Sequence, residues 1–122
     1  MAKKILFVDD DMFFVESYKE RLIISGYEVI HQLQSDKAPE TAVEIKPDLI
    51  ILDLMMPVMS GEEVFRKLKE NPVTKDIPIF IMTALSGNSK LRESLTKEAD
   101  EYIVKSETTP KDFVKIVDHK LK

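Results

Sequence analysis

The sequence predicts an α/β fold in which a five-stranded parallel sheet is covered by helices on both faces. Short, continuous apolar runs recur along the chain, as expected for strands that are buried on both faces. They cover residues 5–8, 27–30, 49–52, 79–82 and 102–104, of which 27–30 is the weakest. Stretches with helical spacing separate the runs, and this alternation of strand and helix is typical of a parallel sheet with helical crossovers.

The helices are predicted from apolar residues that lie one turn apart and from residues that begin or end helices. Asp11 is expected to cap the first helix, Gly26 to end it, and Pro110 to lie in the first turn of the last helix. Turn spacing is found in the sets Val15, Tyr18 and Leu22; Val64 and Leu68; Leu91, Leu95 and Ala99; and Phe113, Ile116 and Val117.

Length and composition exclude several classes of function. The chain has 122 residues without a repeat or linker, so we expect a single domain over residues 1–122 with no output domain. The absence of cysteine excludes a disulfide scaffold, a thiolate zinc site and a cysteine nucleophile. The net charge of −4 argues against direct nucleic-acid binding. No apolar run resembles a membrane span or a secretory signal, so we expect a cytoplasmic protein.

Polar residues follow the predicted strands at their carboxyl ends. In an open parallel α/β sheet the ligand site lies beyond these ends, so such residues are candidates for function. The topology alone should therefore gather carboxylates, a hydroxyl and an ammonium group at one edge of the sheet. The residues concerned are Asp9, Asp10, Asp11, Asp53, Thr83 and Lys105.

The acidic residues among them predict a site for a divalent cation. Asp9, Asp10 and Asp53 would crowd negative charges, which a cation relieves. Mg²⁺ suits such a site because it takes one or two carboxylates, keeps several waters and often completes its shell with a phosphate. The alternative is that aspartates only cap the following helix, and we favour that role for Asp11.

Asp53 suggests phosphoryl chemistry because it ends a buried apolar run. A carboxylate placed there costs free energy unless it is paired or used. Next to Mg²⁺ it can attack phosphorus and form an aspartyl phosphate. The Thr83 hydroxyl could then bind one phosphoryl oxygen, and the Lys105 ammonium could bind another. Either residue alone could be an ordinary strand-end hydroxyl or surface lysine, but together they provide what phosphoryl transfer requires.

The sequence is similar to the receiver domains of response regulators, in particular the single-domain chemotaxis type. The similarity lies in four segments that occur in the family's order, namely ILFVDDD, PDLIILDLMMPVMSG, IMTA and EYIVK. The resemblance covers essentially the whole chain. It implies a flavodoxin-like (βα)5 fold, doubly wound, with strand order 2-1-3-4-5. It also implies that Asp53 accepts a phosphoryl group from a sensor histidine kinase or phosphotransfer protein, with Thr83 and Lys105 as the other catalytic residues.

The resemblance further implies the metal ligands and the switch. Mg²⁺ would be held by Asp10, Asp53 and the backbone carbonyl of Met55, with Asp9 in the outer shell. Thr83 and Tyr102 would form the switch, with Tyr102 turning inward as Thr83 moves toward the phosphoryl group. A downstream protein would then bind the face formed by the fourth helix, fifth strand and fifth helix. Such a domain is not a classical enzyme, although it catalyses its own phosphorylation and slow dephosphorylation.

Three alternatives are less consistent with the residues. A Mg²⁺-dependent phosphohydrolase using an aspartyl phosphate usually needs a second carboxylate two positions after the nucleophile, where this chain has Met55. A nucleotide or flavin binder needs a glycine- or hydroxyl-rich loop after the first strand, where this chain reads DDDMFF. A scaffold that is never phosphorylated would not need the complete set of site residues.

The sequence departs from the receiver pattern at positions that affect the site. Ser106 follows Lys105 where the family usually has proline, so we expect a trans peptide there. Met55 and Leu85 are apolar where many members carry polar side chains. We therefore expect a long-lived phosphoryl group on Asp53, because neither side chain can hold an attacking water.

Overall fold

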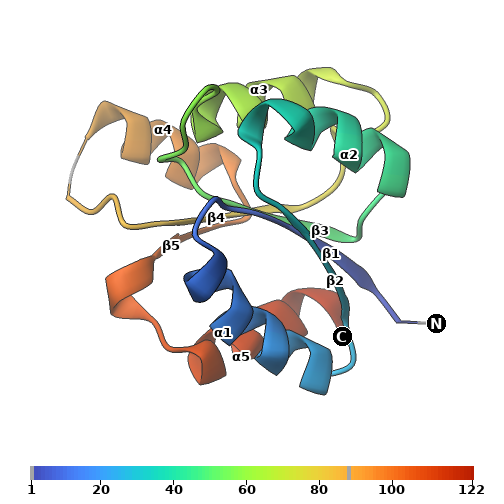
Figure 1. Cartoon of the computed structure of the whole chain (residues 1–122). Coiled ribbons are helices and arrows are strands. Elements are labelled where there is room, and N and C mark those ends of the chain that lie inside the picture. The colour runs from blue at the N-terminus through green and yellow to red at the C-terminus, as the bar shows by residue number, and fades with distance from the viewer. Residues whose placement is uncertain (1, 88) are drawn as a thin grey trace.

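The computed structural model describes residues 2–87 and 89–122 and contains one parallel sheet, whose strands follow the order β2-β1-β3-β4-β5 (Figure 1). This confirms the flavodoxin-like fold and the strand order expected from the sequence. The strands are β1 (Lys4–Val8), β2 (Glu28–Gln32), β3 (Leu49–Leu52), β4 (Ile79–Thr83) and β5 (Glu101–Val104).

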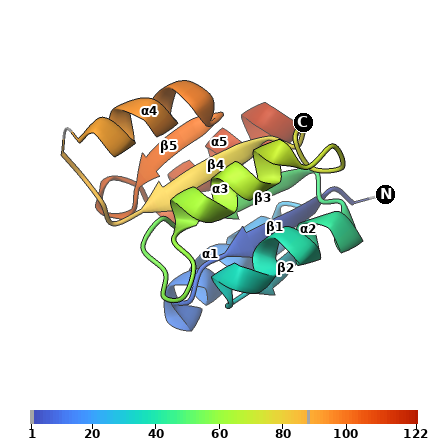
Figure 2. The ribbon, with the colours of Figure 1, turned by 90° about the horizontal axis from the view of Figure 1, so that it is seen from above.

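The helices cover both faces of the sheet. α1 (Met12–Ile24) and α5 (Pro110–Leu121) lie on one face, and α2 (Ala38–Ile45), α3 (Gly61–Glu70) and α4 (Lys90–Glu98) lie on the other (Figures 1 and 2). Two short 3₁₀ helices, η1 (Ser35–Lys37) and η2 (Lys105–Glu107), precede α2 and α5. Within the described part of the chain, no helix combines the length and apolarity needed to cross a bilayer.

Each central strand contributes to two separate apolar clusters. In β1, Ile5 and Phe7 pack under α1 and α5, whereas Leu6 and Val8 pack under the helices of the opposite face; all four side chains are fully buried. Successive side chains of a strand point to opposite faces, so burial of both faces requires an unbroken apolar run. This is the physical reason for the continuous runs in the sequence.

The helix ends follow the predicted capping. The carboxylate of Asp11 accepts a hydrogen bond from the N–H of Phe14 at 3.0 Å. Gly26 has a φ of +102°, and the N–H groups of Gly26 and Tyr27 donate to the carbonyls of Ile23 and Leu22, which closes the C-terminus of α1. Pro110 is the first residue of α5, as expected.

The predicted bounds of β2 are wrong by one to two residues. The strand begins at Glu28 and continues to Gln32, because pairing with β1 extends to Val8. His31 and Gln32 are polar and only partly buried, which β2 tolerates as an edge strand. Tyr27 lies before the strand, buried in the turn after α1, so its apolar character reflects packing outside the sheet.

Candidate functional site

Three aspartates meet at the carboxyl edge of the sheet. Asp9 and Asp10 follow β1 and Asp53 follows β3, and one carboxylate oxygen from each lies within 4.8 Å of the others. Asp9 is 0% exposed and Asp53 is 5% exposed, whereas Asp10 is open to solvent. Backbone hydrogen bonds that continue the sheet hold Asp9 and Asp53 in place. The N–H of Asp53 donates to the carbonyl of Val8, and the N–H of Asp9 donates to the carbonyl of Gln32.

Asp9 is a buried carboxylate with a different partner for each oxygen. Its Oδ1 accepts the N–H of Asp11 at 2.9 Å. Its Oδ2 lies 2.8 Å from Nζ of Lys105. Burial raises the pKa of Asp9, although the contact with Lys105 and the N–H of Asp11 lower it. A buried carboxylate beside two further carboxylates, with one ammonium group to neutralise them, fits a hard divalent cation such as Mg²⁺.

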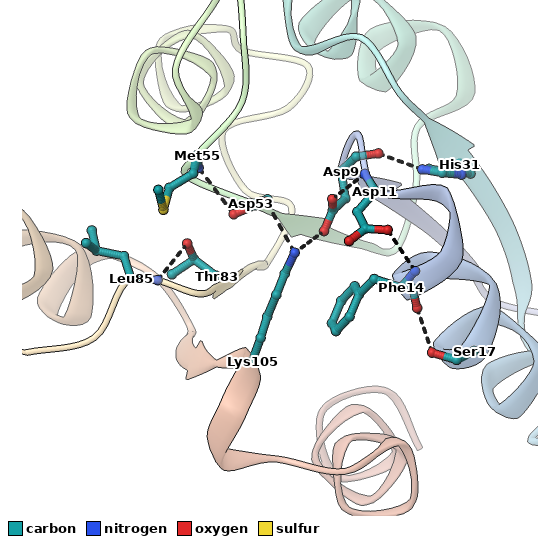
Figure 3. Close-up of polar contacts among 10 residues, drawn as sticks. All are labelled: Asp9, Asp11, Phe14, Ser17, His31, Asp53, Met55, Thr83, Leu85 and Lys105. Atoms are coloured by element: carbon teal, nitrogen blue, oxygen red, sulfur yellow. Dashed lines mark hydrogen bonds and ion pairs between the residues drawn. The ribbon is translucent and has the colours of Figure 1, made fainter.

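Lys105 reaches the acidic cluster from the residue after β5. Its Nζ lies 2.8 Å from Asp9 and 3.3 Å from Asp53, and its side chain is 16% exposed (Figure 3). Burial lowers the pKa of Lys105, but the contacts and charges of Asp9 and Asp53 outweigh it, so that the net pKa is raised. The ammonium group therefore stays charged at neutral pH and neutralises part of the cluster.

The backbone around Asp53 is closely packed against the start of α3. Gly61 donates its N–H to the carbonyl of Leu54 at 3.0 Å. A Cβ on Gly61 would lie 2.1 Å from the carbonyl oxygen of Asp53, so only glycine allows this approach. This explains why a glycine stands at position 61, eight residues after Asp53. The carboxylate of Asp53 in turn accepts the N–H of Met55 at 3.2 Å, which brings the Met55 backbone to the site.

Thr83 and Tyr102 are linked through one peptide unit. The buried hydroxyl of Thr83 accepts the N–H of Leu85 at 3.3 Å, and the hydroxyl of Tyr102 donates to the carbonyl of Leu85 at 3.0 Å. Tyr102 is half-buried, and the guanidinium of Arg92 lies 5.1 Å from the centre of its ring. The two candidate switch residues thus hold the loop between β4 and α4 from two sides.

The structure brings Asp9, Asp10, Asp53 and Lys105 together, and Thr83 ends β4 at the same edge of the sheet. Asp11 caps α1, and its carboxylate serves the helix rather than the acidic cluster. The peptide between Lys105 and Ser106 is trans, as predicted, since the described residues contain no cis peptide bond.

Two neighbours of the site were missed in the sequence. Nε2 of His31 donates to the carbonyl of Asp9 at 2.7 Å, and the ring of Phe14 lies beside Lys105 (Figure 3). His31 belongs to no motif, and only the register of β2 against β1 places it there. Phe14 is one of several apolar residues that follow the acidic run. Nothing in the sequence distinguishes it as a residue that would contact Lys105.

The chain belongs to the response regulator receiver domain family, whose model matches residues 5–118. Receiver domains are phosphorylated by histidine kinases, and an acidic pocket such as that of Asp9, Asp10 and Asp53 is typical of their phosphoacceptor signalling. The chain is thus a receiver domain of two-component signalling and not a classical enzyme.

Among curated relatives, the phosphate regulon transcriptional regulatory protein PhoB of Pseudomonas aeruginosa is 38% identical over 114 residues, which are 93% of this chain and 49% of PhoB. The response regulator PleD of Caulobacter vibrioides is 37% identical over 105 residues, which are 86% of this chain and 23% of PleD. The chain therefore spans half or less of the length of these relatives.

Among solved structures, the chemotaxis protein CheY4 of Vibrio cholerae is 28% identical, with a TM-score of 0.86 and coverage of 99% of this chain and 100% of that one. The receiver domain of a Luxo repressor protein from Vibrio parahaemolyticus is 26% identical, with a TM-score of 0.87 and coverage of 99% and 91%.

Proposed function

We propose that this receiver domain is a phosphorylation-dependent switch that accepts a phosphoryl group on Asp53 from a histidine kinase or phosphotransfer protein. The observation that carries the proposal is the position of the Asp53 carboxylate. It is buried, lies beside Asp9 and Asp10, and has the Lys105 ammonium 3.3 Å away. A nucleophile placed between a cation site and an ammonium group is suited to attack phosphorus.

The metal ligands in this proposal are Asp10, Asp53 and the backbone carbonyl of Met55, with Asp9 in the outer shell. When bound, Mg²⁺ would neutralise the acidic cluster and the charge on the phosphoryl oxygens. The crowding of three carboxylates supports this assignment. The position of the Met55 backbone beside Asp53 is consistent with it.

The chain's own groups have distinct roles in the transfer. A carboxylate oxygen of Asp53 forms the new bond to phosphorus as the bond between phosphorus and the donor's imidazole nitrogen breaks. Lys105 then moves from the carboxylates to a phosphoryl oxygen, which carries more negative charge. The hydroxyl of Thr83 donates to a second phosphoryl oxygen.

The switch would act through the peptide unit of Leu85. Movement of Thr83 toward the phosphoryl group removes the acceptor that now binds the N–H of Leu85. The carbonyl of the same residue binds the hydroxyl of Tyr102, so a shift of this loop releases Tyr102 to turn inward. The change would be read by a downstream protein on the face of α4, β5 and α5.

One alternative function can be compared at the same site. A phosphohydrolase would need an acid–base group where the apolar Met55 lies, and no such group follows Asp53 there. The single-domain organisation expected from the sequence stays a prediction, because the curated relatives are longer than this chain.

The test is phosphorylation by a small donor. Incubation with acetyl phosphate and Mg²⁺ should add the mass of one phosphoryl group, and Asp53→Asn should abolish this addition. Asp11→Asn is the matched control, because asparagine also caps helices and Asp11 is outside the cluster. A wild-type chain that gains no mass, or an Asp53→Asn chain that gains it equally, would contradict the proposal.

A further inference from the structure

The ring of Phe14 lies against the ammonium group of Lys105. Nζ of Lys105 is 4.1 Å from the centre of the ring, well inside the range of about 6 Å for cation–π attraction. The same nitrogen is 2.8 Å from Asp9 and 3.3 Å from Asp53, so two carboxylates and one aromatic face surround it (Figure 3). Phe14 itself has no group that could act as an acid, a base or a metal ligand.

The ring is held in place by the core. Its centre is 4.6 Å from that of Tyr18, and it meets the ring of Phe7 edge-on with the centres 6.5 Å apart. Tyr18 in turn meets Phe113 edge-on at 5.4 Å, so the aromatic column joins β1, α1 and α5. The backbone is also fixed, because the N–H of Phe14 donates to the capping carboxylate of Asp11.

We propose that Phe14 is a positioning residue that holds the Lys105 ammonium for phosphoryl transfer to Asp53. This inference rests on the proposed function, in which Lys105 binds a phosphoryl oxygen. A lysine side chain has many rotamers and loses their entropy when its end is fixed. A rigid aromatic face that attracts the ammonium and excludes water from one side reduces that cost at the moment of transfer.

Three variants separate attraction to the ring from simple packing. Phe14→Leu keeps an apolar side chain but removes the aromatic face, whereas Phe14→Tyr keeps the face. Phe13→Leu is the matched control, because Phe13 precedes Phe14 in α1 and is 91% exposed. Only Phe14→Leu should change the behaviour of Lys105.

The first measurement does not depend on phosphorylation. In the NMR spectrum of the unmodified wild type, the ε-methylene protons of Lys105 should be shifted upfield by the ring current of Phe14. The shift should disappear in Phe14→Leu and persist in Phe14→Tyr and Phe13→Leu. An unshifted wild-type signal would overturn the proposal, even in a chain that is phosphorylated normally.

The second measurement is the rate constant of phosphorylation by acetyl phosphate at saturating Mg²⁺. Phe14→Leu should lower this rate constant about twofold to thirtyfold, which is the effect expected from loss of one cation–π attraction. Phe14→Tyr should retain the wild-type rate constant. In a Lys105→Ala background, Phe14→Leu should have no further effect. An equal loss in that background, or a wild-type rate in Phe14→Leu, would overturn the proposal.

The two measurements distinguish failure of the inference from failure of the proposed function. A wild type that takes up no phosphoryl group refutes the function assigned to Asp53. The ring-current shift then decides by itself whether Phe14 holds the Lys105 ammonium.

Discussion

Asp9 and Asp53 are nearly fully buried carboxylates that share one cationic neighbour, the ammonium of Lys105. Burial of a charge is costly unless it is paired, and one ammonium only partly neutralises two carboxylates and the nearby Asp10. The residual negative charge predicts that the cluster binds a further cation. Individual residues next to the cluster then decide how long a phosphoryl group would last.

Met55 and Leu85 predict slow loss of the phosphoryl group from Asp53. Met55 is 61% exposed beside the site, and Leu85 follows Thr83 by two residues; neither side chain can hydrogen-bond a water in line with phosphorus. Met55→Asn or Leu85→Glu should therefore accelerate decay about tenfold to a hundredfold, equivalent to about 1.4–2.8 kcal/mol of barrier.

The measurement is the decay of the phosphorylated protein in Mg²⁺. Val58→Asn is a suitable control, because Val58 lies in the same loop with a φ of +71° that asparagine tolerates. If neither polar variant decays faster than the wild type, the two side chains do not set the lifetime.

At the scale of elements, the site depends on how tightly helices approach the strands that carry it. The N-terminus of α3 touches the backbone of Asp53 through Gly61, and the C-terminal part of α5 is tied to the turn between α1 and β2 through Asp118. The first contact has no space for a side chain, and the second is polar. Each contact predicts a different response to substitution.

Gly61→Ala should destabilise the fold by at least about 1–3 kcal/mol, the usual cost of overpacking, because its Cβ would overlap the Asp53 carbonyl. It should also slow phosphorylation, since relief of the overlap moves Asp53. Urea unfolding and the acetyl phosphate assay measure the two effects. Gly26→Ala is the comparison: Gly26 has a positive φ but open space around it, so only stability should fall. Equal phosphorylation rates for both variants would contradict this prediction.

The contact of α5 predicts a pH dependence of stability. The hydroxyl of Tyr27 donates to Asp118 at 2.5 Å, and this bond is the main reason that the pKa of Asp118 lies below 3.8. A carboxyl group with a lowered pKa stabilises the fold fully above its unfolded pKa, and the contribution is lost as the pH falls through the folded value. The pKa of Tyr27 is raised above 10, mainly by burial and secondly by the bond to Asp118. The stability that the protonated Tyr27 hydroxyl contributes is therefore lost only as the pH rises above 10.

Asp118→Asn should therefore lose less stability than the wild type as the pH falls from about 5 to about 3, because the asparagine side chain does not titrate. Urea unfolding across this range is the measurement. Asp112→Asn, in the first turn of the same helix, is the control for an Asp-to-Asn change that leaves the bond to Tyr27 in place. Parallel curves for the wild type and Asp118→Asn would show that the bond to Tyr27 does not contribute.

At the scale of the whole molecule, the accessible surface is 6816 Å², close to the value of about 6,700 Å² expected for a single folded domain of this mass. Two apolar clusters stabilise the sheet from its two faces. The acidic cluster lies at one edge and opposes this stabilisation when no cation is bound. Cation binding should therefore be measurable as a change in the stability of the entire fold.

Mg²⁺ should raise the melting temperature, because a ligand that binds only the folded state adds about 2.7 kcal/mol at a hundred times its Kd. Asp10→Asn should reduce the shift, and it should fold normally because Asp10 is exposed. Lys105→Ala should retain Mg²⁺ binding but lose the response to phosphorylation, since an ammonium repels a metal and attracts a phosphoryl group. A melting temperature that is unchanged by Mg²⁺, Mn²⁺ and Ca²⁺ would contradict the metal assignment.

The sequence by itself determined the architecture and the location of the site. Apolar runs such as residues 49–52 are local signals, because a strand buried on both faces must be apolar at every position. Once the strands were parallel, the residues after them had to meet at one edge, which predicted the proximity of Asp9, Asp53 and Lys105. Capping by Asp11 was equally local, since it depends on residues within one turn.

Only the tertiary structure decided which side chains support the site. The bond between Tyr27 and Asp118 joins residues 91 positions apart, and the same separation exists between Phe14 and Lys105. Neither pair has a spacing or a motif that marks it in the chain. Such contacts depend on the register of the strands and on how α1 and α5 pack side by side, which local periodicity does not specify. Packing therefore decided that an aromatic ring, and not solvent, lies against the Lys105 ammonium.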